Sequence, residues 1–283
     1  MRYESDTVCW ELSSRDAAPA LRPHVIGYVG YREWGSEGFR RLETPSDEVH
    51  VILSFGPRIR VGGDLLGSFV AAPDTEHAVV ESLGEQHCLE LRLTPLGAHL
   101  VLGVPMDELA TRTFAFEDVW GSSALVDRLA ALPSWEARFD VLDRVLATRL
   151  AAARPLAPEV EQAWWRLVAT RGAVPVAELV RESGWSRRHF TARFAEQAGL
   201  PPKAFARVLR FQRAKELLAL PDHVRPSLAR IALDCGYYDQ AHFNRDFRAF
   251  AGCTPTELAA RKLPAGWSAD EVTSVQDGAR AAA

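Results

Sequence analysis

The chain has 283 residues, of which 47% are hydrophobic and 25% are charged, and its formal net charge at pH 7 is −4. The length allows two domains, and the composition is typical of a soluble globular protein and excludes a disordered chain. No apolar run approaches the roughly 20 residues that a membrane span requires, and the N-terminus has no secretory signal, so we expect a cytoplasmic protein with no membrane partner.

The charge is divided unevenly along the chain. Residues 1–157 hold 15 Lys and Arg against 23 Asp and Glu, whereas residues 158–263 hold 17 against 11. An acidic first half joined to a basic second half indicates a polyanionic partner for the second half alone.

Residues 1–152 are predicted to form a sensor and dimerisation domain that is rich in strands up to about residue 95 and helical after it. Short apolar runs such as EVHVILSFGP and HCLELRLTP are broken by glycines and prolines, which predicts a small antiparallel sandwich or barrel. Beyond residue 96 the apolar spacing is helical, and Ser122 and Ser134 are the expected helix caps. Two roles fit these helices, a cover for the β-domain core or a dimer face.

A domain of this kind suits a small-molecule effector, because ligand pockets are mainly apolar and aromatic. The candidate pocket residues are Tyr28, Tyr31, Trp34 and Phe55. The histidines before residue 100 are scattered and form no HxH pair, and the four cysteines form no CxxC pair. We therefore expect no metal, no cofactor and no catalytic residue, and we interpret the cysteines as free thiols, with a redox sensor as the alternative.

The chain then changes character. Residues 153–158, ARPLAP, contain two prolines and are predicted to be a linker. Residues 159–263 are predicted to be all helical. Residues 264–283 are small and polar and are predicted to be a disordered tail.

The helical part contains an internal repeat. GWSRRHFTARFAEQAGLPP (184–202) aligns with residues 237–255, 53 positions later. The matched positions include His189-Phe190 with His242-Phe243, Phe194 with Phe247, and Gly199 with Gly252. In each copy a short apolar helix ends near a glycine, and Ser186 or Asp239 is placed to cap a second helix. Helix, glycine turn and helix form the helix-turn-helix unit, whose second helix fits the major groove of DNA.

The segment between the copies is predicted to be a linker helix. PKAFARVLRFQRAKELLAL (202–220) has apolar residues at helical spacing, and its ~18 residues would form a rod of about 27 Å. Such a rod can place two recognition helices on one face of a duplex, about one turn of ~34 Å apart.

The second copy carries a more specific pattern. Its residues are Ile231-Ala232, Cys235-Gly236-Tyr237, Ala241-His242-Phe243, Arg245, Phe247, Gly252 and Thr254-Pro255. With this pattern, residues 159–263 resemble the DNA-binding domain of the AraC/XylS family of bacterial transcription regulators. The strands ahead of them are similar to that family's cupin-like sensor half.

The resemblance implies an α+β chain, with an N-terminal cupin-like β-domain and its helices followed by two helix-turn-helix units. It implies a sequence-specific transcription regulator that binds double-stranded DNA, with an effector, a homodimer and, for an activator, RNA polymerase as candidate partners. One rival is a cupin-type metalloenzyme fused to a DNA-binding domain. Another is an interaction module whose helical half binds protein.

The outward faces of the two second helices carry side chains of the kinds that read base edges. Arg pairs with guanine, Asn and Gln pair with adenine, and the Thr methyl contacts the thymine methyl. By resemblance, base reading maps onto Arg188, Thr191, Gln240, Asn244 and Arg245. Phosphate contacts are predicted for Arg187, Arg193 and Arg248.

Overall fold

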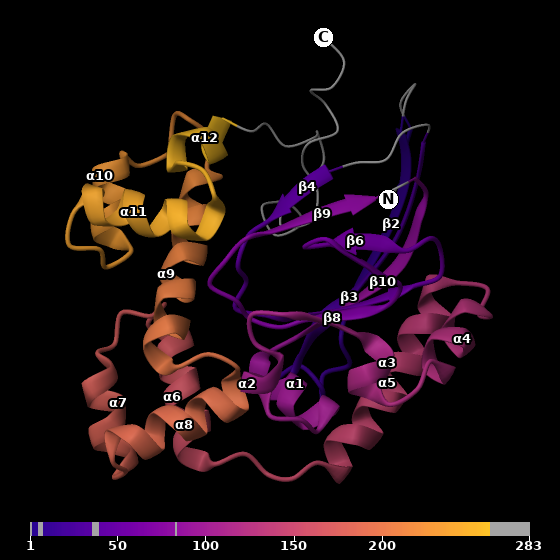
Figure 1. Cartoon of the computed structure of the whole chain (residues 1–283), viewed down its shortest axis with the longest axis horizontal. Coiled ribbons are helices and arrows are strands. Elements are labelled where there is room, and N and C mark those ends of the chain that lie inside the picture. Colours follow the sequence, from indigo (N-terminus) through magenta and orange to yellow (C-terminus); the bar gives the residue numbers. More distant parts are fainter. Residues whose placement is uncertain (1, 5–7, 36–39, 83, 261–283) are drawn as a thin grey trace.

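The computed structural model describes residues 2–4, 8–35, 40–82 and 84–260. Strands and a layer of helices make up the N-terminal part, the described residues up to 152, and the C-terminal part, from residue 158, is helical (Figure 1). The α+β fold class is therefore confirmed. The predicted disordered tail, residues 264–283, lies outside the described residues.

The N-terminal strands form two antiparallel sheets. The larger has the order β1 (Arg2–Glu4), β2 (Val8–Asp16), β3 (Val25–Gly35), β10 (Gln86–Leu93), β5 (Val49–Ser54), β8 (Phe69–Ala71) and β11 (Thr113–Ala115). The smaller has the order β4 (Arg40–Glu43), β9 (Ala78–Ser82), β6 (Ile59–Val61) and β7 (Asp64–Leu66). Short antiparallel strands up to about residue 95 are thus confirmed, and β11 beyond that limit adds one more strand to the large sheet.

The two faces of the large sheet serve different purposes because side chains alternate along a strand. On β5, Val51 and Leu53 belong to the main core, whereas His50 and Ile52 line a cavity of about 820 Å³ between the two sheets. On β10, Leu91 faces the main core and Glu90 faces the cavity. A helical layer covers one face, and the small sheet covers the other.

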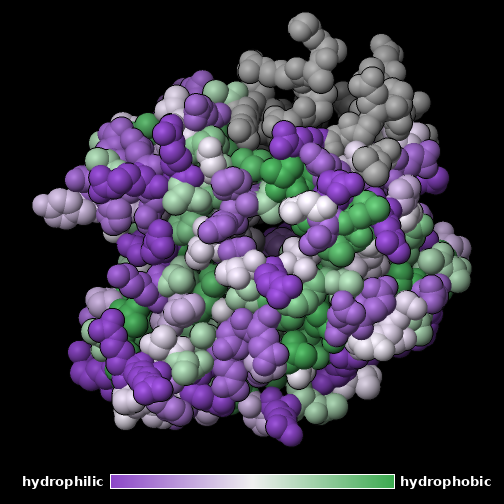
Figure 2. All heavy atoms as spheres, in the orientation of Figure 1, coloured by the Kyte–Doolittle hydropathy of each residue, from purple (hydrophilic) through white to green (hydrophobic). Residues whose placement is uncertain are grey.

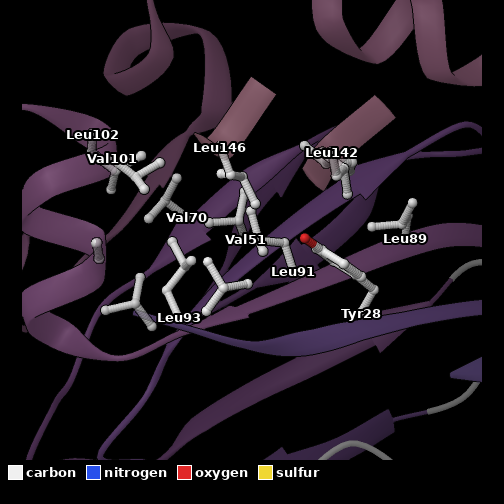
Figure 3. Close-up of a cluster of buried hydrophobic side chains, with 14 of the residues drawn as sticks. Tyr28, Val51, Val70, Leu89, Leu91, Leu93, Val101, Leu102, Leu142 and Leu146 are labelled. Carbon is white, nitrogen blue, oxygen red and sulfur yellow. The ribbon is translucent and has the colours of Figure 1, made fainter. Parts of the chain in front are cut away.

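The helical layer consists of α1 (Pro95–Leu102), α2 (Met106–Leu109), α3 (Phe116–Trp120), α4 (Ala124–Ala130) and α5 (Trp135–Ala152). Figure 3 shows side chains of this layer, such as Leu146, lying over strand residues such as Val51 and Leu91. These helices therefore cover the β-domain core, which is one of the two predicted roles.

The helix caps follow the prediction at α5 and depart from it at α4. The Ser134 hydroxyl accepts a hydrogen bond from the amide of Ala137 at 3.3 Å, so the cap of α5 is confirmed. The N-cap position of α4 is Ser123. The predicted residue, Ser122, precedes it, and its hydroxyl accepts a hydrogen bond from the amide of Ala124 at 3.1 Å. The helix therefore begins one residue later than predicted, and the hydroxyl of Ser123 forms no hydrogen bond to a helix amide.

The C-terminal part consists of α6 (Pro158–Ala169), α7 (Val176–Ser183), α8 (Arg187–Ala198), α9 (Pro202–Leu218), α10 (Leu228–Asp234), α11 (Gln240–Ala251) and α12 (Pro255–Ala260). Helix α9 has 17 residues and is about 26 Å long. Its first half places Phe205 and Val208 in one core, and its second half places Phe211 and Ala214 in another. Helices α6, α7 and α8 gather at one end of α9, and α10, α11 and α12 gather at the other (Figure 1).

Candidate nucleic-acid interface

Two helix-turn-helix units stand at the ends of α9. Unit 1 is α7 with α8, and unit 2 is α10 with α11. The Ser186 hydroxyl accepts from the amide of His189 at 3.3 Å, and the Asp239 carboxylate accepts from the amide of His242 at 2.7 Å. Both predicted N-caps are confirmed, so the first turn of each second helix is held by its own sequence.

The turns of the two units differ in length. Gly184 and Gly236 have φ values of 68° and 73°, the left-handed conformation that glycine adopts without strain. Gly184 lies two residues before its cap, whereas Gly236 lies three residues before Asp239. The turn of unit 2 is therefore one residue longer, and its Tyr238 side chain is 89% exposed.

An aromatic residue in each turn braces the second helix. In unit 1 the Trp185 ring packs edge-on against His189, with centroids 4.6 Å apart. In unit 2 the Tyr237 ring packs against His242 at 5.3 Å. Both histidines therefore have a packing role. Burial raises the pKa of the Tyr237 hydroxyl above its ordinary value.

The phenylalanines of both copies are buried, as predicted. Phe190 and Phe194 pack in the first core, and Phe243 and Phe247 pack in the second. The copies differ at the position of Phe250, where unit 1 has Gln197. Gln197 is 2% exposed, and its Oε1 accepts from the amide of Ala157 at 3.2 Å. Unit 1 thereby holds the segment that enters α6.

The predicted reading residues divide into exposed and half-buried sets. The exposed set is Arg187, Arg188, Gln240, Arg245 and Arg248, and the half-buried set is Thr191, Arg193 and Asn244. Arg193 pairs with Glu196 at 2.5 Å. The Asn244 amide oxygen is buried with no hydrogen-bond partner among the described residues.

Two acidic side chains on or next to these helices are paired with arginines of neighbouring helices. Glu182 of α7 is bonded to Arg166 of α6. Asp246 of α11 accepts two hydrogen bonds from Arg207, at 3.1 and 3.0 Å. Within the described ranges, no ion pair engages Arg187, Arg188, Arg245 or Arg248. The outward faces therefore carry positive charge, and hydrophilic residues predominate over the C-terminal helices in Figure 2.

Both recognition helices have their C-terminal ends against the N-terminal part. Helix α8 packs on α1 and α2, and its C-cap Gly199 lies beside Met106. The C-cap of α11, Gly252, lies against the ring of His77. Each helix has 12 residues and is about 18 Å long, so both N-terminal turns lie well away from the N-terminal part.

The predicted pocket residues occupy different places. Tyr31 lines the 820 Å³ cavity. Tyr28 is 1% exposed in the main core, where its hydroxyl donates to Asp143 at 2.6 Å. Phe55 packs against the same core. Trp34 lies under the guanidinium of Arg32, at 5.6 Å, and is not among the residues that line the cavity.

The cavity also contains a histidine–carboxylate pair. His50 Nδ1 lies 2.6 Å from Glu90. Burial alone would lower the pKa of His50, but the hydrogen bond and the charge of Glu90 outweigh it and raise the pKa. In the part of the chain that the structure describes, no three His, Cys, Asp or Glu side chains form a group that could hold a metal ion. No helix there has the length and apolarity to cross a bilayer.

Sequence comparison connects these units to known proteins. Residues 179–261 match a family profile described as "Helix-turn-helix domain". The "F1 operon positive regulatory protein" of Yersinia pestis is 37% identical over 86 residues, which make up 30% of this chain. The match spans 27% of that protein, about a quarter of its length.

Solved structures show weaker likeness. ToxT from Vibrio cholerae is similar with a TM-score of 0.46 and 8% identity, over 90% of this chain and 98% of that one. The C-terminal domain of AraT, a response regulator from Geobacillus stearothermophilus, has a TM-score of 0.35 and 17% identity, over 41% and 94%. Similarity at this level does not establish a shared function. The family profile and the two units seen in the structure agree that residues 179–261 contain a helix-turn-helix domain.

Proposed function

We propose that this protein is a sequence-specific DNA-binding transcription regulator in which residues 159–263 read DNA and residues 1–152 act as sensor. The observation that carries the proposal is the arrangement of α8 and α11. Both helices have their C-caps against the N-terminal part and their N-terminal turns at the opposite end. Helix α8 carries exposed Arg187 and Arg188 in its first turn, and α11 carries exposed Arg245 and Arg248 further along. The N-terminal residues of a recognition helix are those that reach base edges in the major groove.

The proposal assigns roles to the individual side chains. Arg188 of α8, and Gln240 and Arg245 of α11, are exposed and have the chemistry of base readers. Arg187 and Arg248 are exposed without an ion-pair partner among the described residues and suit phosphate contacts. The protein would act by binding, without catalysing a reaction, in the compartment that holds the DNA.

The N-terminal part is proposed to respond to a small effector in the cavity between the sheets. The cavity has apolar walls, including Tyr31, Ile52 and Phe69, and a polar pair, His50 with Glu90. This mixture is common in ligand pockets. Since the aligned Yersinia pestis protein is named a positive regulatory protein, we propose an activator, which would act on RNA polymerase, within a homodimer.

The experiment is selection of bound fragments from a random duplex pool by the full chain, followed by a salt titration on the selected sequence. Phosphate neutralisation predicts that log K falls linearly with log salt concentration, and loss of one phosphate contact reduces that slope by about 1. Arg187→Ala and Arg248→Ala should each have this effect. Arg128→Ala, at an exposed position on α4, is the matched control. Failure to enrich any sequence, or binding that is insensitive to salt, would contradict the proposal.

A further inference from the structure

The two helix-turn-helix units are attached to the N-terminal part in different ways. Unit 1 is packed onto it, because α8 lies against α1 and α2, and Leu96 of α1 is buried in the same core as Phe190 and Phe194. The hydrogen bond from the Ala157 amide to Gln197 also fixes the segment that leads from the N-terminal part into α6. Unit 1 and the N-terminal part therefore behave as one packed body.

On the side of unit 2, the second half of α9, the loop after it and α12 face the N-terminal part across a cleft of about 1180 Å³. Hydrogen bonds cross this cleft from the second half of α9. Gln212 Nε2 donates to the carbonyl oxygen of Pro45 at 2.6 Å, and Lys215 Nζ donates to Thr44 Oγ1 at 2.8 Å. An open cleft with local bridges is a weaker attachment than a shared core, because it buries little apolar surface.

A third contact comes from the loop between β8 and β9, residues 72–77. A Cβ placed on Gly252 would lie 2.8 Å from His77 Nε2, so the imidazole rests directly on the C-cap of α11. The same loop reaches the equivalent glycine of the first copy, since Pro73 Cδ is 3.7 Å from the Cβ position of Gly199. One loop of the N-terminal part thus contacts the matched C-caps of both recognition helices.

We infer that His77, Gln212 and Lys215, which we name the strap residues, position unit 2 relative to unit 1 and so set the spacing of the two DNA half-sites that the protein reads. The inference rests on the proposed function and adds a specificity determinant outside the recognition helices. The cores of the two units share α9, with the first half in one and the second half in the other. A single helix joining two bodies allows bending, and the strap supplies a second point of attachment.

The size of the effect follows from the length of α9. A bend of about 10° at its midpoint moves the end, ~13 Å away, by ~2 Å, and moves α11 further. Base pairs are spaced by ~3.4 Å along the duplex. Small rotations of unit 2 are therefore enough to change which spacing of half-sites both helices can occupy together.

The test compares the full-length wild type with a strap variant carrying His77→Ala, Gln212→Ala and Lys215→Ala. Both are offered duplexes in which the distance between the selected half-sites is changed by one to three base pairs. We expect the wild type to lose at least tenfold in affinity on the altered spacings and the variant to lose less than threefold. An unchanged spacing preference in the variant would overturn the inference, because α9 alone would then set the distance.

A second measurement needs no DNA. Ketone-directed spin labels at exposed positions, Arg144 of α5 with Ala249 of α11, report the distance between the N-terminal part and unit 2. As the matched control, labels at Arg144 and at Ala192 of α8 report the distance between the N-terminal part and unit 1. The strap variant should broaden the first distance distribution at least twofold and leave the second unchanged. Equal widths in wild type and variant would overturn the inference. If neither the wild type nor the strap variant binds DNA, the proposed function fails. The distance measurement then still shows whether the strap residues position unit 2.

Discussion

Phe247→Ala is expected to disable unit 2 while unit 1 stays folded. Phe247 is completely buried, and its ring lies 5.0 Å from that of Phe211 and 5.5 Å from that of Phe243, between centroids. Removal of such a side chain typically costs 3–5 kcal/mol, because the apolar contacts are lost and a cavity remains. The core of unit 2 is a separate cluster, so the cost falls on that cluster.

The magnitude can be compared with the stability of the unit itself. Folded domains have roughly 0.05–0.15 kcal/mol of stability per residue, so the ~50 residues from the second half of α9 to the end of α12 have about 2.5–7.5 kcal/mol. A loss of 3–5 kcal/mol is of the same order, and unit 2 should be largely unfolded in the variant. Unit 1 keeps its own phenylalanine core, which includes Phe190 and Phe194.

Hydrogen exchange measured by mass spectrometry separates the two units. Peptides from α10 and α11 should exchange near the rate of an unfolded chain, whereas peptides from α7 and α8 keep wild-type protection. On selected DNA, footprinting should show protection of one half-site only. The matched variant Phe194→Ala should show the reverse pattern of half-sites. Equal loss of protection in both units after Phe247→Ala would refute the reasoning, because it would mean that the two cores unfold as one.

Two further predictions concern single side chains. Arg245→Ala should cost roughly 1–3 kcal/mol at the selected site and relax base preference at one position, measured by competition with sequence variants; uniform weakening on every sequence would make Arg245 a phosphate contact instead. Asp47→Asn tests a pH dependence. Burial, with the nearby charge of Glu48, raises the pKa of Asp47 from 3.8 to about 6. The contribution of this group to the unfolding free energy of the wild type is therefore lost as pH rises from 3.8 to about 6. At pH 7.5 the unfolding free energy of the variant should exceed that of the wild type by up to about 3 kcal/mol, and near pH 3.5 the two should be equal. Urea unfolding at both pH values measures this difference. A difference of the same size at both pH values would show that burial of the charge is not the cause.

The two helix-turn-helix units could be predicted from the sequence because the signals that specify them are local. Ser186 and Asp239 cap their helices through amides three residues away, and apolar residues at helical spacing lie on one face wherever the helix is placed. The repeat added a second, independent copy of each signal. Sequence alone therefore determined the units, their phenylalanine cores and the helix that joins them.

The tertiary structure decided the features that depend on contacts between distant residues. Tyr28 and Tyr31 lie on opposite faces of β3, and only the packing of α5 on one face made Tyr28 a core residue and left Tyr31 on the cavity. Likewise, His77 meets Gly252 because two separately folded parts dock together. Local patterns specify which side of an element is apolar, but they do not specify what covers it, since that depends on how the whole chain minimises its exposed apolar surface.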